Sequence, residues 1–327
     1  MVVGNLETPF SILKKEYGAK SAHLCTDPVN VELLKMWNVK AVSLANNHIF
    51  DYGKEGYETT IRVLDESGIS HFGDKGKTVE YKTGNNKLLF SGYCCYSSNP
   101  LSVTKVVGGY GVNRYNVKDV GDSINATSKD GYLNIVAVHA GKEHVNYPSI
   151  DHIRAARKLS TAGAYVYYGG HTHTIQGVEE YKGSLISHSC GNFCFDDIYT
   201  KTSGNDPLVR LTENNRTGMV LELTIENNRV VDWREQVIYL DKKGTLELVN
   251  RDELIAGYNN ELIHAEDSPE EYMRQRQKVL DARIEERKLS RDLKWVLKRM
   301  RPQYVRLVLD MRRNKRLYDK NVRCHVL

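Results

Sequence analysis

Short runs of apolar and β-branched residues alternate with stretches of helical spacing over the first two thirds of the chain. Residues 55–69, with Gly68 near their end, and residues 149–164 predict helices. Such alternation of strands and helices predicts an α/β fold with buried parallel strands. The predicted strands lie within residues 40–48, 87–96, 132–140, 164–170 and 184–193.

The pattern changes in the last third. Residues 218–240 alternate apolar and polar positions about Asn227 and Asn228, which predicts an antiparallel hairpin and therefore a mixed sheet. Beyond about Tyr239 the spacing becomes helical. We therefore expect one domain over residues 1–240 and a helical C-terminal extension over residues 241–327.

The extension carries clear helix signals. Ser268 is a predicted N-cap, Pro269 occupies the first helical position and Glu271 completes a capping box, which opens a helix over residues 267–300. Pro302 is expected to break this helix before residues 303–320 resume it.

Composition and charge narrow the class of protein. The six cysteines form neither a spaced disulfide framework nor CxxC pairs, so we expect them to be reduced and mostly buried. No run approaches the ~18 apolar residues of a membrane span, and the amino terminus lacks a secretory pattern. These features predict a cytoplasmic location, and contact with the inner membrane surface stays open.

Positive charge is concentrated in the extension. From Arg291 onward twelve Lys and Arg face three Asp, a balance of +9, so the preceding residues sum to −4 of the total of +5. One interpretation is a packed helix with a solvated basic side. The other is attraction to an anionic lipid surface or polymer, or contact with a synthase complex. The apolar stripe of the packed helix would be Leu289, Leu293, Val296 or Leu297, and Met300.

Four polar clusters follow predicted strands, where α/β sheets place their reactive side chains. Each has an ordinary structural alternative: Glu7 could be a surface charge, Asn46 and Asn47 a turn, and His139 a hydrogen-bonded core residue. Together they provide a carboxylate, amides and imidazoles, the ligands of zinc, manganese or iron. A shared metal site is the favoured interpretation. The clusters are residues 4–9, 45–53, 139–144 and 169–173.

The last cluster is the most distinctive. In the sequence GGHTH, residues 169–173, two glycines allow the backbone to pass close to another group. The alternating His171 and His173 can then point their imidazoles in related directions.

Five segments carry a family resemblance. NLETP, SLANNHIFDYG, HAGKEH, GGHTHTIQGVEEYKG and SHSCGNFCFD occur in the order and approximate spacing of the CapA family, the poly-γ-glutamate capsule biosynthesis proteins. This family belongs to the calcineurin-like metallophosphoesterase superfamily. The resemblance covers about residues 1–240, and it implies a sandwich of mixed sheets flanked by helices.

The resemblance also implies a metal centre and roles for its residues. His48 would donate a proton to a leaving group, and Asp51 and Glu143 would orient imidazoles as further catalytic residues. Two divalent ions, manganese, iron or zinc, would activate water and stabilise charge at phosphorus. Gln176, Glu179 and Asn192 resemble positions that line the same cleft. The implied metal ligands are Glu7, Asn47, His139, His171 and His173.

One part of the superfamily pattern is lacking. A first strand ending in an aspartate would precede the sequence MVVGNLE, where this chain already enters the second motif. Either the chain is incomplete, which we favour because the other motifs are intact, or it is a degenerate homologue with one good metal site.

Three functions remain open. The first is a metal-dependent hydrolase of a phosphoester, or of an anionic precursor, in capsule or exopolysaccharide synthesis. The second is a non-catalytic metal-binding assembly factor for a polymer-synthesising complex. The third, a nuclease, is disfavoured because the basic extension lacks aromatic residues spaced for stacking on bases.

Overall fold

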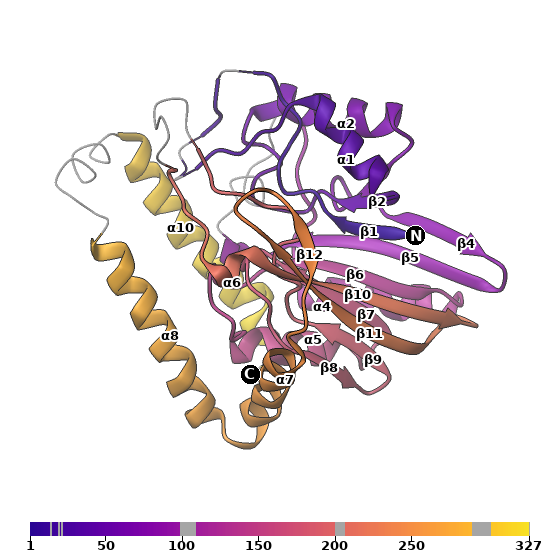
Figure 1. Cartoon of the computed structure of the whole chain (residues 1–327). Coiled ribbons are helices and arrows are strands. Elements are labelled where there is room, and N and C mark those ends of the chain that lie inside the picture. Colours follow the sequence, from indigo (N-terminus) through magenta and orange to yellow (C-terminus); the bar gives the residue numbers. More distant parts are fainter. Residues whose placement is uncertain are drawn as a thin grey trace.

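A central sheet of six strands organises the chain (Figure 1). The computed structural model describes residues 1–13, 15–18, 20, 22–98, 109–199, 207–289 and 302–326. The order of the central sheet is β4 (Val79–Thr83), β5 (Asn86–Cys94), β6 (Leu133–His139), β7 (Tyr165–Gly170), β9 (Ser184–Ser187) and β8 (Val178–Tyr181). Strands β5, β6, β7 and β9 are parallel, and antiparallel β4 and β8 form the edges, so the prediction of a mixed sheet is confirmed.

Two three-stranded sheets accompany the central sheet. One is parallel and contains β1 (Val2–Asn5), β2 (Val39–Ser43) and β3 (Ser70–Phe72). The other is antiparallel and contains β10 (Thr217–Glu226), β11 (Arg229–Leu240) and β12 (Leu246–Leu248). The predicted hairpin is confirmed, since β10 and β11 join at Asn227 and Asn228, whose positive φ angles of 49° and 61° asparagine tolerates well.

Alternating side chains give the central strands two apolar faces. Val136 and Val138 of β6 pack with α4 (Val117–Lys129) and α5 (Ile150–Leu159) on one face. Ile135 and Ala137 pack on the other face with side chains of β1, β2, β3, β10 and β11. The two smaller sheets therefore cover the face opposite the helices, which confirms the predicted sandwich flanked by helices.

The sandwich is open between its two smaller sheets. Strands β1 and β10 are end strands of their sheets and line one cavity of about 1960 Å³. The floor of this cavity includes Phe90, Ile135 and Val166 of the central sheet.

The remaining helices surround this sandwich. Helix α2 (Gly53–Glu66) overlaps the predicted 55–69 region, beginning two residues earlier and ending three earlier, and packs with α1 (Val31–Met36) against β2. Helix α8 (Pro269–Leu289) begins at the predicted proline, and α10 (Pro302–Asn321) begins at the predicted break. Among the described residues, no helix is both long enough and apolar enough to cross a membrane. The short elements are α6 (Glu213–Arg216), η1 (Pro28–Asn30), η2 (Tyr96–Ser98) and η3 (Arg323–His325).

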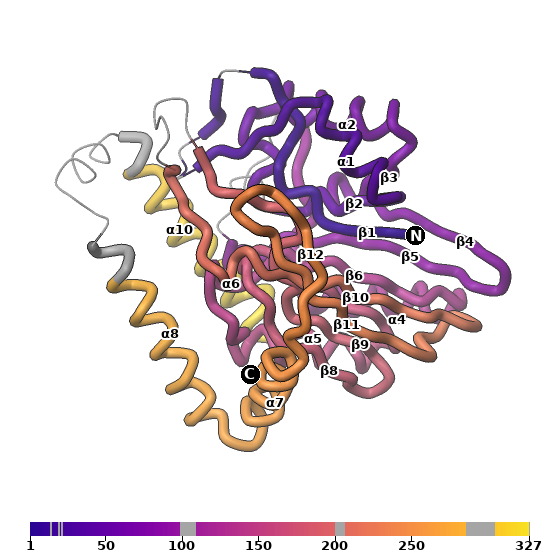
Figure 2. The backbone as a smooth tube through the Cα atoms, in the orientation of Figure 1, coloured from indigo at the N-terminus to yellow at the C-terminus, as the bar shows by residue number. Residues whose placement is uncertain are grey.

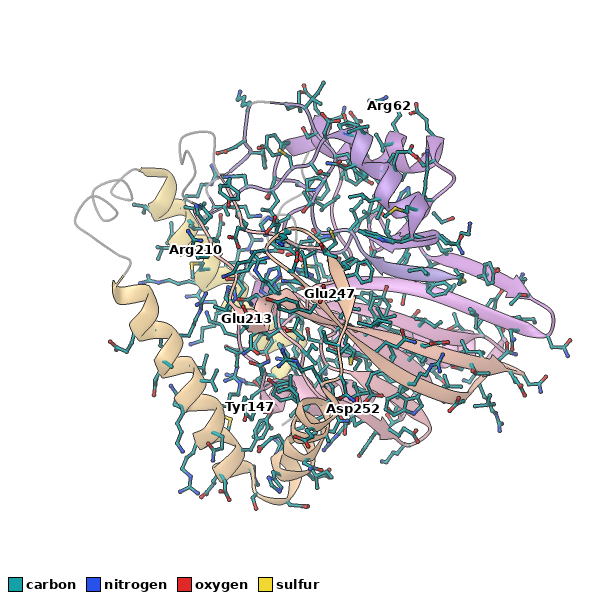
Figure 3. All side chains as sticks on the ribbon, viewed as in Figure 1. Arg62, Tyr147, Arg210, Glu213, Glu247 and Asp252 are labelled. Atoms are coloured by element: carbon teal, nitrogen blue, oxygen red, sulfur yellow. The ribbon has the colours of Figure 1, made fainter. Side chains whose placement is uncertain are left out.

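The C-terminal extension shares cores with the preceding residues. Ile255 of α7 (Asp252–Asp267) joins the cluster of Ile175 and Val178. Tyr147, labelled in Figure 3, lies 5.9 Å from the ring of Tyr272 on α8. The division at residue 240 stays a prediction, and these contacts anchor the extension to the sandwich.

Gly169 allows β7 to pass close to the segment after β9. A Cβ atom there would lie 1.9 Å from the carbonyl oxygen of His188. We expect Gly169→Ala to lower the free energy of unfolding by about 3 kcal/mol or more, because backbone must move. Gly257→Ala in α7, where the added Cβ meets no atom within 4 Å, should instead raise the free energy of unfolding by as much as about 1 kcal/mol. Urea unfolding measures both, and equal effects would contradict the steric explanation.

The largely buried Glu179 carboxylate joins β8 to α5 and to His188, which directly follows β9. It accepts hydrogen bonds from Arg157 at 2.7 Å and from His188 at 2.9 Å. Burial raises the pKa of Glu179, but His188 and Arg157 outweigh it and hold that pKa below its usual value. A lowered folded-state pKa means that the carboxylate stabilises the fold above its unfolded pKa and loses this effect as the pH falls through the folded value.

Glu179→Gln should therefore destabilise the protein by about 3 kcal/mol at neutral pH, since it breaks a buried ion pair. Its difference from wild type should shrink as the pH falls below the unfolded glutamate pKa of about 4.3, because the unfolded chain then takes up a proton before the folded protein does. Urea unfolding across this pH range measures the effect. The exposed Glu180→Gln is the matched control, and a difference independent of pH would contradict the linkage.

Candidate metal centre

The predicted site residues follow strands that end at one side of the sandwich. Glu7 lies two residues after β1, and Asn47 follows β2. His139 is the last residue of β6, and His171 comes directly after β7. Each of these strand pairs is parallel, so the carboxyl ends of its strands meet at one edge.

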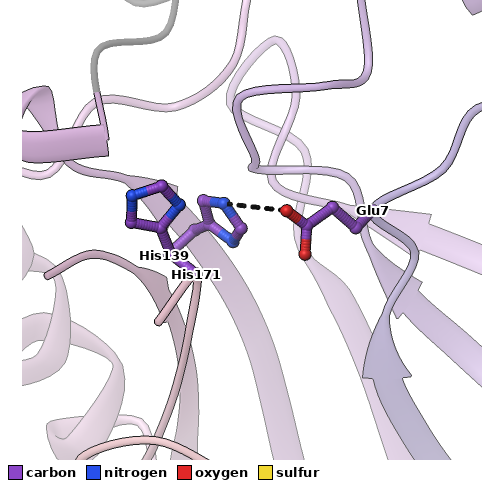
Figure 4. Close-up of side chains that lie close together, drawn as sticks. All are labelled: Glu7, His139 and His171. Atoms are coloured by element: carbon purple, nitrogen blue, oxygen red, sulfur yellow. Dashed lines mark ion pairs between the residues drawn. The ribbon is translucent and has the colours of Figure 1, made fainter. Parts of the chain in front are cut away.

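Glu7, His139 and His171 form a buried cluster (Figure 4). One ligand atom from each lies within 4.8 Å of the others. His139 Nε2 is 3.7 Å from Glu7 Oε1 and 2.7 Å from the side-chain oxygen of Asn47. Two atoms that bind one zinc ion at about 2.1 Å lie roughly 3.0 to 3.4 Å apart. The two distances from His139 Nε2 bracket that range, whereas the 4.8 Å limit that includes His171 lies above it. The side chains would therefore draw closer together around one ion.

Unsatisfied polar atoms indicate that the cluster is built for a ligand. Glu7 Oε1, His139 Nδ1 and His171 Nδ1 are buried without a hydrogen-bond partner in the described structure. Leaving such atoms unpaired costs about 1–3 kcal/mol each. A divalent cation would satisfy the Glu7 carboxylate, and the mixed nitrogen and oxygen donors of the cluster suit zinc, manganese or iron. His139 Nδ1 is not the ring nitrogen that faces Glu7, so its missing partner is separate from metal binding.

The imidazoles are held neutral, as metal binding requires. Burial lowers the pKa of His139 well below its usual value, and the nearby His171 and His173 add to this effect. Burial likewise lowers the pKa of His171 to about 3, although the negative charge of Glu143 opposes the shift. Glu143, predicted to orient an imidazole, thus acts electrostatically on His171.

Left-handed backbone shapes the turn that presents the two histidines. His171 has φ +85° and His173 φ +56°, conformations that are uncommon outside glycine and cluster at functional sites. Asn215 stabilises the turn by donating to the His173 carbonyl at 2.8 Å. Nothing in the sequence pattern indicated Asn215.

The tautomer of His173 follows from its neighbours. Asn192 donates its amide N–H to the Asn215 carbonyl, so its side-chain oxygen accepts a hydrogen bond from the Nδ1–H group of His173 at 2.9 Å. In the neutral ring, His173 Nε2 then carries the lone pair, and it lies 3.6 Å from Glu7 Oε1. His173 and Glu7 could contribute to a second ion.

The two asparagines after β2 have separate tasks. The Asn46 side-chain oxygen accepts from the backbone N–H groups of His48 and Ile49, both at 3.0 Å, and its amide donates to the Leu6 carbonyl. Asn46 therefore builds the turn and ties it to β1. Asn47 is left free to face His139.

His48 lies beside the cluster and is fixed from behind. Its Nδ1 is 2.6 Å from Asp51, and its Nε2 is 3.9 Å from Glu7 Oε1. Burial raises the pKa of Asp51, but Lys20 and His48 outweigh it and lower that pKa. The predicted orienting role of Asp51 thus has a geometric basis, since Asp51 leaves Nε2 of His48 directed at the cluster.

Lys20 is a component that the sequence pattern did not reveal. Its ammonium pairs with Asp51, lies 3.0 Å from His48 Nδ1 and donates to the Asn47 carbonyl at 2.7 Å. Lys20 and Glu7 both line the large cavity. The cavity wall therefore carries a cation near the candidate metal site.

The ordered segments that form this site also identify the family. The family described as "Bacterial capsule synthesis protein PGA_cap" matches residues 1–197, more than half of the chain. The chain belongs to this family. The predicted resemblance to CapA proteins is thereby confirmed.

Curated relatives of this PGA_cap chain carry the CapA name. "PGA biosynthesis protein CapA" of Bacillus subtilis is 29% identical over 225 residues, which cover 66% of this chain and 59% of the relative. "Capsule biosynthesis protein CapA" of Bacillus anthracis is 28% identical over 212 residues, 62% of this chain and 52% of the relative. The chain thus spans between half and three fifths of these relatives.

Solved structures of similar fold share little sequence with this PGA_cap chain. Calcineurin-like phosphoesterase YfkN from Bacillus subtilis is 16% identical with a TM-score of 0.39, covering 73% of each chain. The Thermus thermophilus sulfate thiohydrolase SoxB is 11% identical with a TM-score of 0.42, covering 74% of this chain and 39% of that chain.

Some sequence expectations for this PGA_cap chain need correction. Asn192 contacts His173, but Glu179 pairs with Arg157 and His188, and Gln176 donates to the Val145 carbonyl at 2.8 Å. The expectation of mostly buried cysteines is wrong, since Cys25, Cys194 and Cys324 are exposed, although all six thiols are free as expected.

Proposed function

We propose that this PGA_cap chain is a metal-dependent hydrolase of phosphoester bonds that acts in the synthesis of an anionic surface polymer. One observation carries the proposal: the buried cluster of Glu7, His139 and His171 lies beside a histidine whose other nitrogen is held by Asp51. The names of the Bacillus relatives support the biological setting.

Each residue of the site would have a separate role in the proposed hydrolysis. Glu7, Asn47, His139 and His171 would hold a divalent ion, manganese, iron or zinc, and His173 with Glu7 would contribute to a second. When bound, such ions supply Lewis acidity that polarises a phosphoryl oxygen and activates water. His48 would donate a proton from Nε2 to the leaving oxygen, while Asp51 holds Nδ1. Lys20 compensates the buried Asp51 charge and adds a cation that favours an anionic substrate.

The test is a direct assay of the full chain. The protein is loaded with manganese, iron or zinc, its metal content is measured, and an aryl phosphate and an aryl phosphodiester are offered. We expect hydrolysis of at least one that disappears with a chelator and returns with metal. Stoichiometric metal without hydrolysis of either ester would overturn the proposal.

A specific observation favours a second function, that of a non-catalytic assembly factor. Among the residues that the structure describes, only His173 and the shared Glu7 are placed to bind a second ion, which is few ligands for a catalytic two-metal centre. Two related proteins of Mycobacterium tuberculosis, 24% identical, are named "Probable polyglutamine synthesis accessory protein". Normal polymer production by cells carrying His48→Ala would favour this function over hydrolysis.

A further inference from the structure

Helix α10 presents two chemically different sides. On the inner side, Asn314 is 2% exposed, Leu317 and Tyr318 pack against the apolar cores, and Val322 is fully buried. Figure 2 traces how the backbone runs from α10 to the end of the chain. There Arg323 pairs with Asp151 at 2.9 Å, although the two residues lie far apart in sequence. These contacts fix the orientation of the helix, so the opposite side is held toward solvent.

The outer side combines aliphatic and cationic residues. Val305, Leu309, Arg312 and Arg316 follow one another at spacings of four, three and four, which places them on one stripe. Val305 is 63% and Leu309 57% exposed. We call this stripe, together with the flanking residues of the same surface, the outer face of α10. The exposed flanking residues are Arg306, Val308, Met311, Arg313, Lys315 and Lys320.

Charge identifies the kind of partner. Residues 305–321 of α10 contain six basic and two acidic side chains, whereas the chain before Arg291 sums to −4. An anionic surface would therefore be attracted by this helix and repelled by the rest of the molecule. A second copy of the same face would be repelled by like charges, and a soluble polyanion has no need of Val305 and Leu309.

We propose that the outer face of α10 docks on the surface of an anionic phospholipid bilayer. The aliphatic side chains at the start of the helix enter the boundary between headgroups and acyl chains. Arg312 and Arg316 keep their guanidinium groups among lipid phosphates while their stems cover apolar surface. The apolar stripe expected over residues 289–300 lies outside the described side chains. The proposal does not depend on hydrolysis.

The experiment measures binding of the full chain to vesicles of phosphatidylcholine with and without phosphatidylglycerol, by flotation. We expect binding to the anionic vesicles only, weakening as salt is raised. Arg312→Glu/Arg316→Glu and Val305→Gln/Leu309→Gln should each lower the partition coefficient at least about tenfold. Arg229→Glu/Lys242→Glu makes the same charge change at exposed positions elsewhere and should bind like wild type.

Thermal melts show which variants keep the fold, and the glutamine pair tests the proposal without any change of charge. Absence of binding at low salt would overturn the proposal, as would equal binding to both vesicle types. Binding that survives Val305→Gln/Leu309→Gln and is competed away by soluble polyglutamate would identify a polyanion surface instead, and would also overturn it.

Discussion

Replacing His171 with asparagine is expected to reduce the affinity for manganese or zinc by at least about 100-fold, because a ligand of the cluster is lost. Asparagine tolerates the left-handed backbone found at residue 171, so the turn should survive. Glu7→Gln should have a comparable effect, since it removes the carboxylate charge of the cluster. Isothermal titration of the metal-free protein measures the affinities.

A thermal readout gives an independent check. A ligand at 100 times its Kd stabilises the folded state by about 2.7 kcal/mol, so wild type should melt at higher temperature with metal and the variants should not. His152→Asn is the matched control, because His152 is also a buried histidine with an unpaired nitrogen but lies on α5. If His171→Asn bound metal as wild type does, the cluster would not be the metal site.

The strand ends of the site could be predicted because local patterns define them. Apolar runs mark β2, β6 and β7, and polar residues follow each run directly. Parallel pairing brings those ends together, so the sequence alone was enough to predict that Asn47, His139 and His171 lie in one site. The hairpin at Asn227 and the break at Pro302 were predictable for the same reason, since turn and breaker residues act locally.

Contacts made by irregular segments could not be predicted. Lys20 belongs to a loop without periodicity, and only the fold brings its ammonium to Asp51. Asn215 reaches the His173 carbonyl from a short helix more than forty residues away in sequence. Glu179 resembled a cleft residue, yet the arrangement of α5 beside β8 gives it Arg157 as its partner. Such pairings depend on tertiary packing, which motif spacing does not encode.

The opening between β1 and β10 leads to the candidate metal site. Glu7 lies two residues after β1 and lines the same cavity as Lys20, His171 and His173. A cavity of about 1960 Å³ exceeds the usual range of small-molecule pockets, about 300–1,000 Å³. Two members of the cluster, Glu7 and His171, therefore lie on the wall of this large cavity.

If the proposed hydrolysis is correct, His48→Ala should lower kcat by about 10²- to 10⁴-fold, the usual contribution of a general acid. Metal affinity should change little, because His48 Nε2 is 3.9 Å from Glu7 Oε1 and the cluster itself does not include His48.

The size of the loss in kcat should depend on the leaving group. An alkyl phosphate needs a proton on its departing oxygen, whereas a nitrophenolate leaves without one. His48→Ala should thus affect the alkyl ester far more, and Asp51→Asn should show the same selectivity at smaller size, since Asp51 only fixes the imidazole. Equal losses for both esters would assign His48 to substrate binding instead of proton transfer.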